Sequence, residues 1–141
     1  MKNFTQTIFF CVALFSAQAA LSQVAVVVGA KSDVAALTAD QVSSLYLGKT
    51  DKFPNGNTAM PLDQATGSAV RNNFYDKVTG KSEAQVKSAW SRLVFSGKGT
   101  PPKEVASSAE IKKLVTNNPN TIGYIEKSAV DSSVKVVLTS D

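Results

Sequence analysis

A short run of β-branched and small apolar residues sets the strongest constraint on how this chain can fold. Residues Val24 to Val28 read Val-Ala-Val-Val-Val, and Gly29 follows them. Because successive side chains of a strand point to opposite faces, an uninterrupted apolar run predicts a strand that is buried on both faces. Such a strand needs covering layers on each side, which favours a parallel or mixed sheet.

Helix signals alternate with further strand signals along the rest of the chain. Two capping boxes, Thr38–Gln41 and Ser82–Gln85, each place a Gln three residues after a hydroxyl residue and predict the start of a helix. Further strands are predicted over 58–62 (with Pro61 confined to an edge or a strand end), 121–125 and 134–138, and further helices over 68–78 and from Ser107 or Ser108 up to Asn117. This alternation predicts a single α/β domain with a small mixed sheet flanked by helices.

The first residues have the pattern of a cleaved secretory signal peptide. Lys2 precedes the apolar run Ile8–Phe15, and Ala17-Gln18-Ala19 supplies a small-residue cleavage site. The run is shorter than the roughly 20 apolar residues that a membrane span requires. We therefore expect residues 1–19 to be a signal peptide, residues 20–141 to form one periplasmic domain, and the mature chain to have no transmembrane segment.

Composition excludes several classes of function. The chain has no His, and its one cysteine, Cys11, leaves with the signal peptide. Ser-His-Asp and Cys-His catalysis and imidazole-bound metal or haem are thereby excluded. We expect no metal, no cofactor and no catalytic residue, although a small hydrolase that works through Asp and Glu alone stays open as a third class.

The charge of the mature chain points to a small anionic partner. It keeps 14 basic and 11 acidic residues, and its longest basic cluster is Lys112-Lys113, with no interleaved aromatic residues. This pattern argues against nucleic acid. A small anion or an acidic surface is a better candidate partner.

The segment from Asp63 to Arg71 is the best candidate for an anion site. It follows a predicted strand and opens a predicted helix, whose first N–H groups are free to bind an anion. Thr66 and Ser68 add hydroxyl groups, Gly67 lets the backbone approach closely, and Arg71 lies one turn further on. The alternative is that Thr66 or Ser68 only caps the helix.

Two aromatic positions complete the sequence interpretation. Trp90 shares helical spacing with Val86 and Leu93, which is typical of a core residue. Phe95 and Pro101-Pro102 are interpreted as a packed loop, with an apolar lip on the surface as the alternative.

Several segments, taken in order, resemble one family. Leu37 to Lys49 (LTADQVSSLYLGK) resembles the "LT-x-x-q-l-x-x-I-F-l-G-k" signature of the periplasmic phosphate-binding proteins of ABC transporters. Matches to the same family follow at Pro61–Phe74, Trp90–Gly97 and Asn118–Ile125. The resemblance covers about Val24 to Leu138 and implies one lobe of a type II periplasmic-binding-protein-like fold, similar to the second lobe of a two-lobed protein.

The chain departs from the family at the anion motif "R-S-D-G-S-G-T-T". Gln64 stands where the family has its anion-binding Arg, Ser68 matches the family's Ser, and Ala69-Val70 replace Gly-Thr. Arg71 is the candidate replacement for the missing Arg. The resemblance therefore implies a ligand site made of Gln64, Thr66, Gly67, Ser68 and Arg71.

Two functions are compatible with these observations. The first is a periplasmic solute-binding-like protein that recognises phosphate or a related oxyanion, with an envelope protein or a second copy of the chain closing the site. The second is a non-enzymatic cell-envelope interaction or scaffold module that has lost ligand binding.

Overall fold

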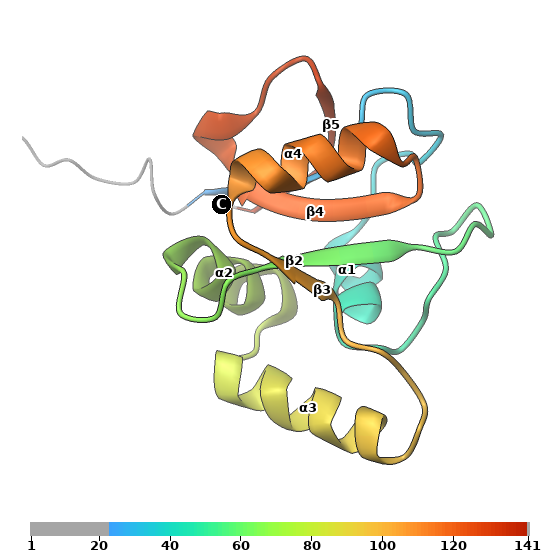
Figure 1. The fold of residues 1–141 in the computed structure, drawn as a ribbon, viewed down its shortest axis with the longest axis vertical. Helices are drawn as coiled ribbons and strands as arrows, with labels where there is room; N and C mark the ends of the chain where they lie inside the picture. The colour runs from blue at the N-terminus through green and yellow to red at the C-terminus, as the bar shows by residue number, and fades with distance from the viewer. Residues whose placement is uncertain (1–22, 141) are drawn as a thin grey trace, which may run out of the picture.

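The computed structural model describes residues 23–140, which form a central sheet with helices on both of its faces (Figure 1). The strands are β1 (Val24–Gly29), β2 (Met60–Gln64), β3 (Lys103–Val105), β4 (Thr121–Glu126) and β5 (Val134–Ser140), and the helices are α1 (Ala39–Tyr46), α2 (Ala69–Phe74), α3 (Glu83–Phe95) and α4 (Ser108–Asn117). The predicted signal peptide lies outside the described residues. Within the described part, no helix is long and apolar enough to cross a membrane.

The sheet is mixed, with strand order β3-β2-β4-β1-β5. Strand β2 runs parallel to β3 and β4, whereas β1 runs antiparallel to β4 and β5. Every residue of β1 is buried, as the apolar run predicts. The expected fold class, an α/β structure with a small mixed sheet flanked by helices, is therefore confirmed.

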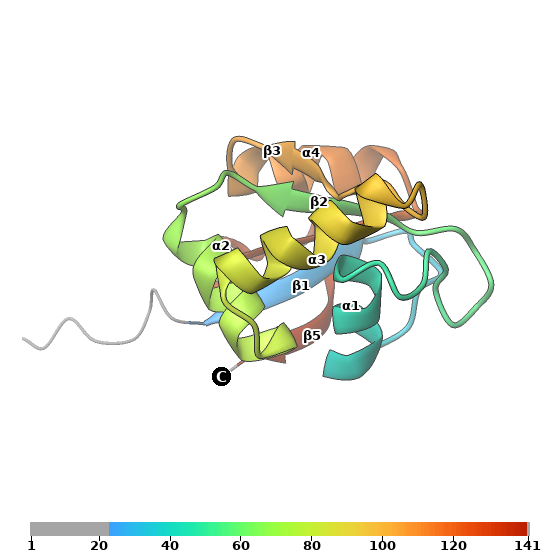
Figure 2. The same ribbon diagram turned by 90° about the horizontal axis from the view of Figure 1, so that it is seen from below.

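Each face of the sheet carries its own core. On one face α4 places Ile111 and Val115 against Ala25 and Val27 of β1. On the other face α1 and α2 pack on the alternate residues of β1, around a cluster of buried aromatic rings. Figure 2 shows α3 crossing in front of the sheet on this second side. Helix α3 contributes little to the core, because Val86 is its one fully buried residue.

The helix starts follow the sequence closely. Thr38 and Ser82 form complete capping boxes with Gln41 and Gln85, and Ser107 caps α4. The helix predicted over 68–78 is α2 followed directly by a π-helical turn, η1 (Tyr75–Thr79). Strand β3 has no sequence signal and was not predicted. Strand β2 covers Met60–Gln64 rather than 58–62, and Pro61 lies near its start, in agreement with the expected strand end.

Gly29 ends β1 where α4 lies too close for any side chain. A Cβ atom at this position would lie 2.3 Å from the backbone oxygen of Val115. Backbone cannot move aside as a flexible side chain can, so Gly29→Ala is expected to lower the free energy of unfolding by about 1–3 kcal/mol in urea denaturation. Gly99→Ala is the matched control, because its Cβ would meet only the Trp90 ring, at 3.2 Å. Equal stability of the two variants would contradict this account.

Candidate functional site

The candidate site lies where β2 ends and α2 begins. Parallel pairing of β2 with β3 places Asp63 opposite Glu104. The loop 65–68 then turns into α2, and Gly67 takes the left-handed conformation, with φ of 85°, that favours glycine. Arg71 follows in the first turn of α2. Glu83, the first residue of α3, approaches the same loop from the other side.

The amide groups of this loop are already occupied by carboxylate oxygens. The N–H of Thr66 donates to Oε1 of Glu104 at 2.9 Å, and the N–H of Gly67 donates to Oε1 of Glu83 at 3.3 Å. Both acceptors are side chains of this same chain. The loop therefore holds oxyanions, and in this structure the chain supplies them itself.

Arg71 adds the positive charge of the site. Its side chain is 13% exposed, and its Nη1 donates to the backbone oxygen of Gln64 at 2.9 Å. Its Nε lies 3.3 Å from Oε1 of Glu83, and its Nη1 lies 3.5 Å from Oε2 of Glu104 and 3.7 Å from Oδ2 of Asp63. The Nε atom is buried and makes no hydrogen bond of good geometry with any described residue.

The guanidinium of Arg71 stays protonated. Burial lowers the pKa of its guanidinium, but the nearby Asp63 carboxyl, with Tyr75, Tyr124 and Glu83, outweighs this effect and raises the pKa above its ordinary value. Arg71 is therefore a permanent cation that faces three carboxylates.

Asp63 is buried beneath the loop and accepts hydrogen bonds from three neighbouring groups. Its carboxyl accepts hydrogen bonds from the Tyr75 hydroxyl at 2.6 Å, from the Tyr124 hydroxyl and from the N–H of Gln64 at 3.0 Å. Burial raises the pKa of Asp63, even though the two tyrosines and Arg71 act to lower it. Burial also raises the pKa of both tyrosines, so their hydroxyl groups stay protonated and act as donors.

The five site residues predicted from the sequence lie in different environments. Thr66, Gly67 and Arg71 converge on the two glutamates. Ser68 is the N-cap of α2, and its Oγ accepts from the N–H of Arg71 at 3.1 Å. The Gln64 side chain is buried, and its Nε2 donates to Ser108 at 3.0 Å and to the Tyr124 carbonyl at 2.9 Å. Gln64 therefore supports Arg71 through its backbone carbonyl alone.

Sequence reasoning did not assign Glu83 and Glu104 to the site, and it included Asp63 only as the first residue of the candidate segment, with no role of its own. Glu83 is an acidic residue in the first turn of a capped helix, which is an ordinary structural preference. Glu104 lies on a three-residue strand that follows Pro101-Pro102 and carries no strand pattern. Only the parallel pairing of β2 with β3 brings Glu104 to the loop.

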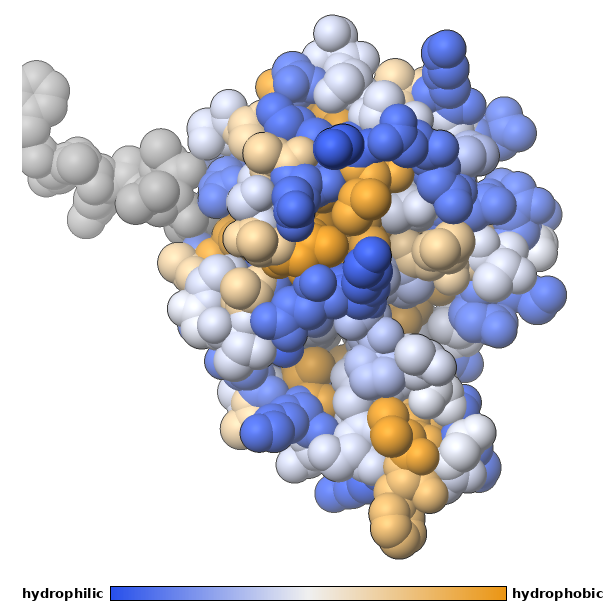
Figure 3. Space-filling view, viewed as in Figure 1, coloured by the Kyte–Doolittle hydropathy of each residue, from blue (hydrophilic) through white to orange (hydrophobic). Residues whose placement is uncertain are grey.

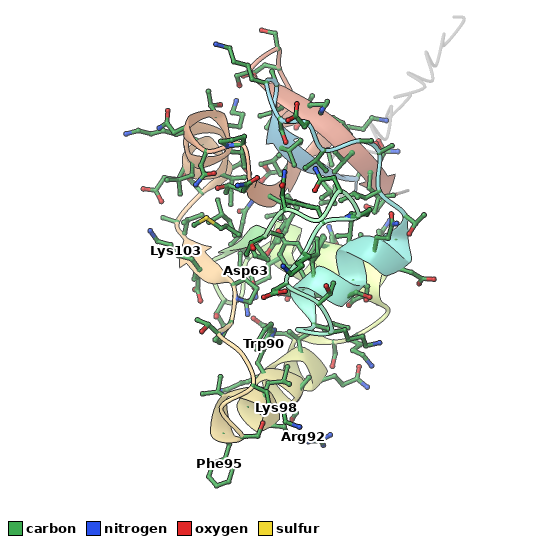
Figure 4. All side chains as sticks on the ribbon, turned by 90° about the vertical axis from the view of Figure 1, so that its right-hand side faces the viewer. Asp63, Trp90, Arg92, Phe95, Lys98 and Lys103 are labelled. Carbon is green, nitrogen blue, oxygen red and sulfur yellow. The ribbon has the colours of Figure 1, made fainter. Side chains whose placement is uncertain are left out.

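A cleft of about 780 Å³ extends from this charged group along α3. Its apolar wall consists of Val86, Trp90, Val94, Phe95, Pro101 and Pro102. The Trp90 indole N–H donates to the carbonyl of Tyr46 at 2.8 Å, which ties α3 to α1. Figure 4 shows Trp90 between α3 and the body of the protein, whereas Phe95 projects from the far end of the helix.

Comparison with solved structures places the fold. A phosphate ABC transporter substrate-binding protein from Clostridium perfringens, solved with bound phosphate, aligns with a TM-score of 0.66 and 27% identity over 83% of this chain and 45% of its own. An ABC-type phosphate transport receptor from Vibrio cholerae aligns with a TM-score of 0.64 and 21% identity over 83% of this chain and 47% of its own. This chain has the fold of one lobe of the phosphate-type substrate-binding proteins.

The same fold occurs in a solved structure of lower sequence identity. PstS from Borrelia burgdorferi aligns with a TM-score of 0.60 at 11% identity, over 81% of this chain and 46% of its own. No protein-family model matches the chain. The chain spans less than half the length of each of these solved structures. The names of the Clostridium perfringens and Vibrio cholerae proteins describe binding and transport.

Proposed function

We propose that this phosphate-type lobe is a non-enzymatic periplasmic binding protein that takes phosphate or a related oxyanion at the loop between β2 and α2. The N–H groups of Thr66 and Gly67 and the guanidinium of Arg71 contact the ligand. Ser68 caps α2, and the carbonyl of Gln64 orients Arg71. Residues 1–19 act as the export signal.

One observation carries the proposal: these donors already bind the oxygens of two carboxylates. A set of donors that holds Glu83 and Glu104 has the geometry to hold a free oxyanion in their place. The buried Nε of Arg71, which lacks a well-directed acceptor, supports the same conclusion. The phosphate bound in the Clostridium perfringens protein is consistent with this choice of ligand.

The two glutamates act as internal competitors for the ligand. An incoming oxyanion must displace Glu83 and Glu104 from the loop, or bind close to their negative charges. Either the displacement or the repulsion lowers the affinity for the ligand. The site is also open to the cleft, where water screens charges. We therefore expect a dissociation constant on the order of 1 mM for phosphate in the unaltered protein.

Calorimetric titration of the chain from Ala20, with phosphate, sulfate and arsenate in turn, tests the proposal directly. Arg71→Lys keeps the positive charge and removes the planar fork, so it is expected to weaken binding about tenfold or more. Lys112→Gln is the control, because this lysine pairs with Asp131, away from the cleft. Absence of saturable heat with all three anions would overturn the proposal.

The fact that the N–H groups of Thr66 and Gly67 are already occupied favours a second candidate function. In that case the lobe has exchanged its ligand for its own glutamates and serves as an interaction module of the cell envelope. The calorimetric result separates the two candidates, because this module would bind none of the three anions even when both glutamates are neutralised.

A further inference from the structure

Among residues 23–140, nothing covers the apolar C-terminal end of helix α3. Phe95 is 96% exposed and Val94 is 52% exposed, both at its C-terminal end. Figure 1 shows α3 standing apart from the sheet, and Figure 3 shows hydrophobic side chains gathered at the same end of the molecule. Val94 and Phe95 are contiguous with the apolar wall of the cleft, and a contiguous exposed apolar surface indicates a contact site.

The charges along α3 are divided between its two ends, with acidic residues at the N-terminal end and basic residues towards the C-terminal end. The N-terminal end carries Glu83, close to Glu104 and Asp63. From residue 84 to residue 103 the chain contains four basic residues and no acidic residue. Two of the four, Arg92 and Lys98, come three residues before and three residues after Phe95, the last residue of α3. One end of the helix is therefore acidic, and the other is basic and apolar.

We propose that a second copy of this chain binds along α3, with the two α3 helices antiparallel across a two-fold axis. Glu83 and Phe95 are twelve residues apart, or about 18 Å along the helix. An antiparallel arrangement brings the basic, apolar end of each helix to the acidic end of the other. The partner's Phe95 then enters the apolar cleft between α3 and Pro101-Pro102.

A second copy is favoured over other occupants because the chain contains both halves of the contact. The cleft of about 780 Å³ offers an apolar wall to a phenyl ring, and its charged end offers carboxylates to a basic group. A two-fold axis uses each surface twice and closes the assembly at a dimer. A lipid surface would match the basic and apolar end but leave the acidic end of the cleft without a partner.

The first test is the oligomeric state of the chain from Ala20, measured by light scattering after gel filtration at increasing concentration. The unaltered chain is expected to form a dimer. Phe95→Ser is expected to raise the dimer dissociation constant about tenfold or more, as loss of a central aromatic contact does. Met60→Ser is the matched control, because Met60 is 52% exposed and lies on β2, outside the cleft.

A cross-linking test locates the interface. Ser91 lines the cleft near the middle of α3, whereas Ser88 lies on another face of the helix. Because the chain from Ala20 has no cysteine, Ser91→Cys is expected to form a disulfide-linked dimer and Ser88→Cys is not. A monomer at every concentration, or a dimer unaffected by Phe95→Ser, would overturn the proposal. So would capture of Phe95 by phosphatidylglycerol vesicles without dimer formation.

The dimer and oxyanion proposals share the charged end of the cleft, because Glu83 and Glu104 face both the ligand loop and the basic end of the partner copy. Phe95→Ser leaves Thr66, Gly67 and Arg71 unchanged, so its phosphate titration reports on the anion site alone. A monomeric chain that still binds phosphate would overturn the dimer proposal alone. A dimeric chain whose Phe95→Ser variant binds no phosphate would overturn the oxyanion proposal alone.

Discussion

Asp63→Ala is expected to lower the free energy of unfolding by about 3–5 kcal/mol, the largest effect of any substitution proposed for this protein. The Asp63 carboxyl is buried and accepts from two tyrosine hydroxyls and from the N–H of Gln64. Its removal leaves the Tyr75 and Tyr124 hydroxyls without an acceptor and takes a counter-charge from Arg71. Urea denaturation followed by circular dichroism measures the change.

Asp76→Ala is the matched control for this prediction. Asp76 is an exposed acidic residue on η1, in the same part of the fold, and its removal is expected to change stability by no more than about 0.5 kcal/mol. If the chain does not fold at all with Ala at position 63, Tyr75→Phe and Tyr124→Phe test the same network one hydrogen bond at a time. A cost below about 1 kcal/mol for Asp63→Ala would contradict the account.

The raised pKa of Asp63 also predicts a pH dependence with an unusual sign. A carboxyl whose pKa is higher in the folded protein than its ordinary value of 3.8 binds its proton more tightly when folded. Its contribution therefore grows as pH falls from neutral through the folded pKa, and is complete below 3.8. The stability difference between the unaltered chain and Asp63→Asn is expected to increase from pH 7 to pH 4. A decrease would show that the folded pKa is lowered instead.

The local elements of this fold could be predicted from the sequence because the signal for each element lies within its own residues. The apolar run Val24–Val28 predicts a strand that is buried on both faces. Two capping boxes mark the starts of α1 and α3. Strand β3 could not be predicted, because three residues after a Pro-Pro pair carry no periodicity. Its place in the sheet depends on β2, whose paired residues lie 41 positions earlier in the chain.

The candidate site could be predicted only in part, for a related reason. The loop from Gln64 to Arg71 is contiguous, so its donors were visible as a pattern. The acceptors that fill them, Glu83 and Glu104, come from two other elements and meet the loop through tertiary structure alone. A sequence shows where N–H groups are free within a helix, but not which distant carboxylate reaches them.

Phe95 shows the same limit on the apolar side. The packed loop expected for Phe95 and Pro101-Pro102 is wrong for Phe95, which is exposed, and the alternative of an apolar surface lip describes this residue instead. Trp90 was interpreted as core and does pack against it, but the same side chain also forms a wall of the cleft.

Neutralising both internal competitors is expected to strengthen phosphate binding about tenfold or more. In Glu83→Gln with Glu104→Gln, two negative charges leave the neighbourhood of the ligand, and like charges this close cost several kcal/mol. The Gln side chains keep the size of the originals but bind the Thr66 and Gly67 amides less strongly than carboxylates do. Calorimetric titration of the double variant with phosphate measures the gain.

The matched control for that pair is Asp33→Asn with Asp51→Asn. It removes the same two charges from exposed positions away from the cleft, so it reports the effect of net charge alone. If the control gains as much affinity as the glutamate pair, the effect is general attraction and the loop is not the site. If neither variant binds phosphate, the donors hold only their own glutamates. A gain confined to the glutamate pair would locate the ligand at the Arg71 loop, because only there do these two carboxylates stand in its place.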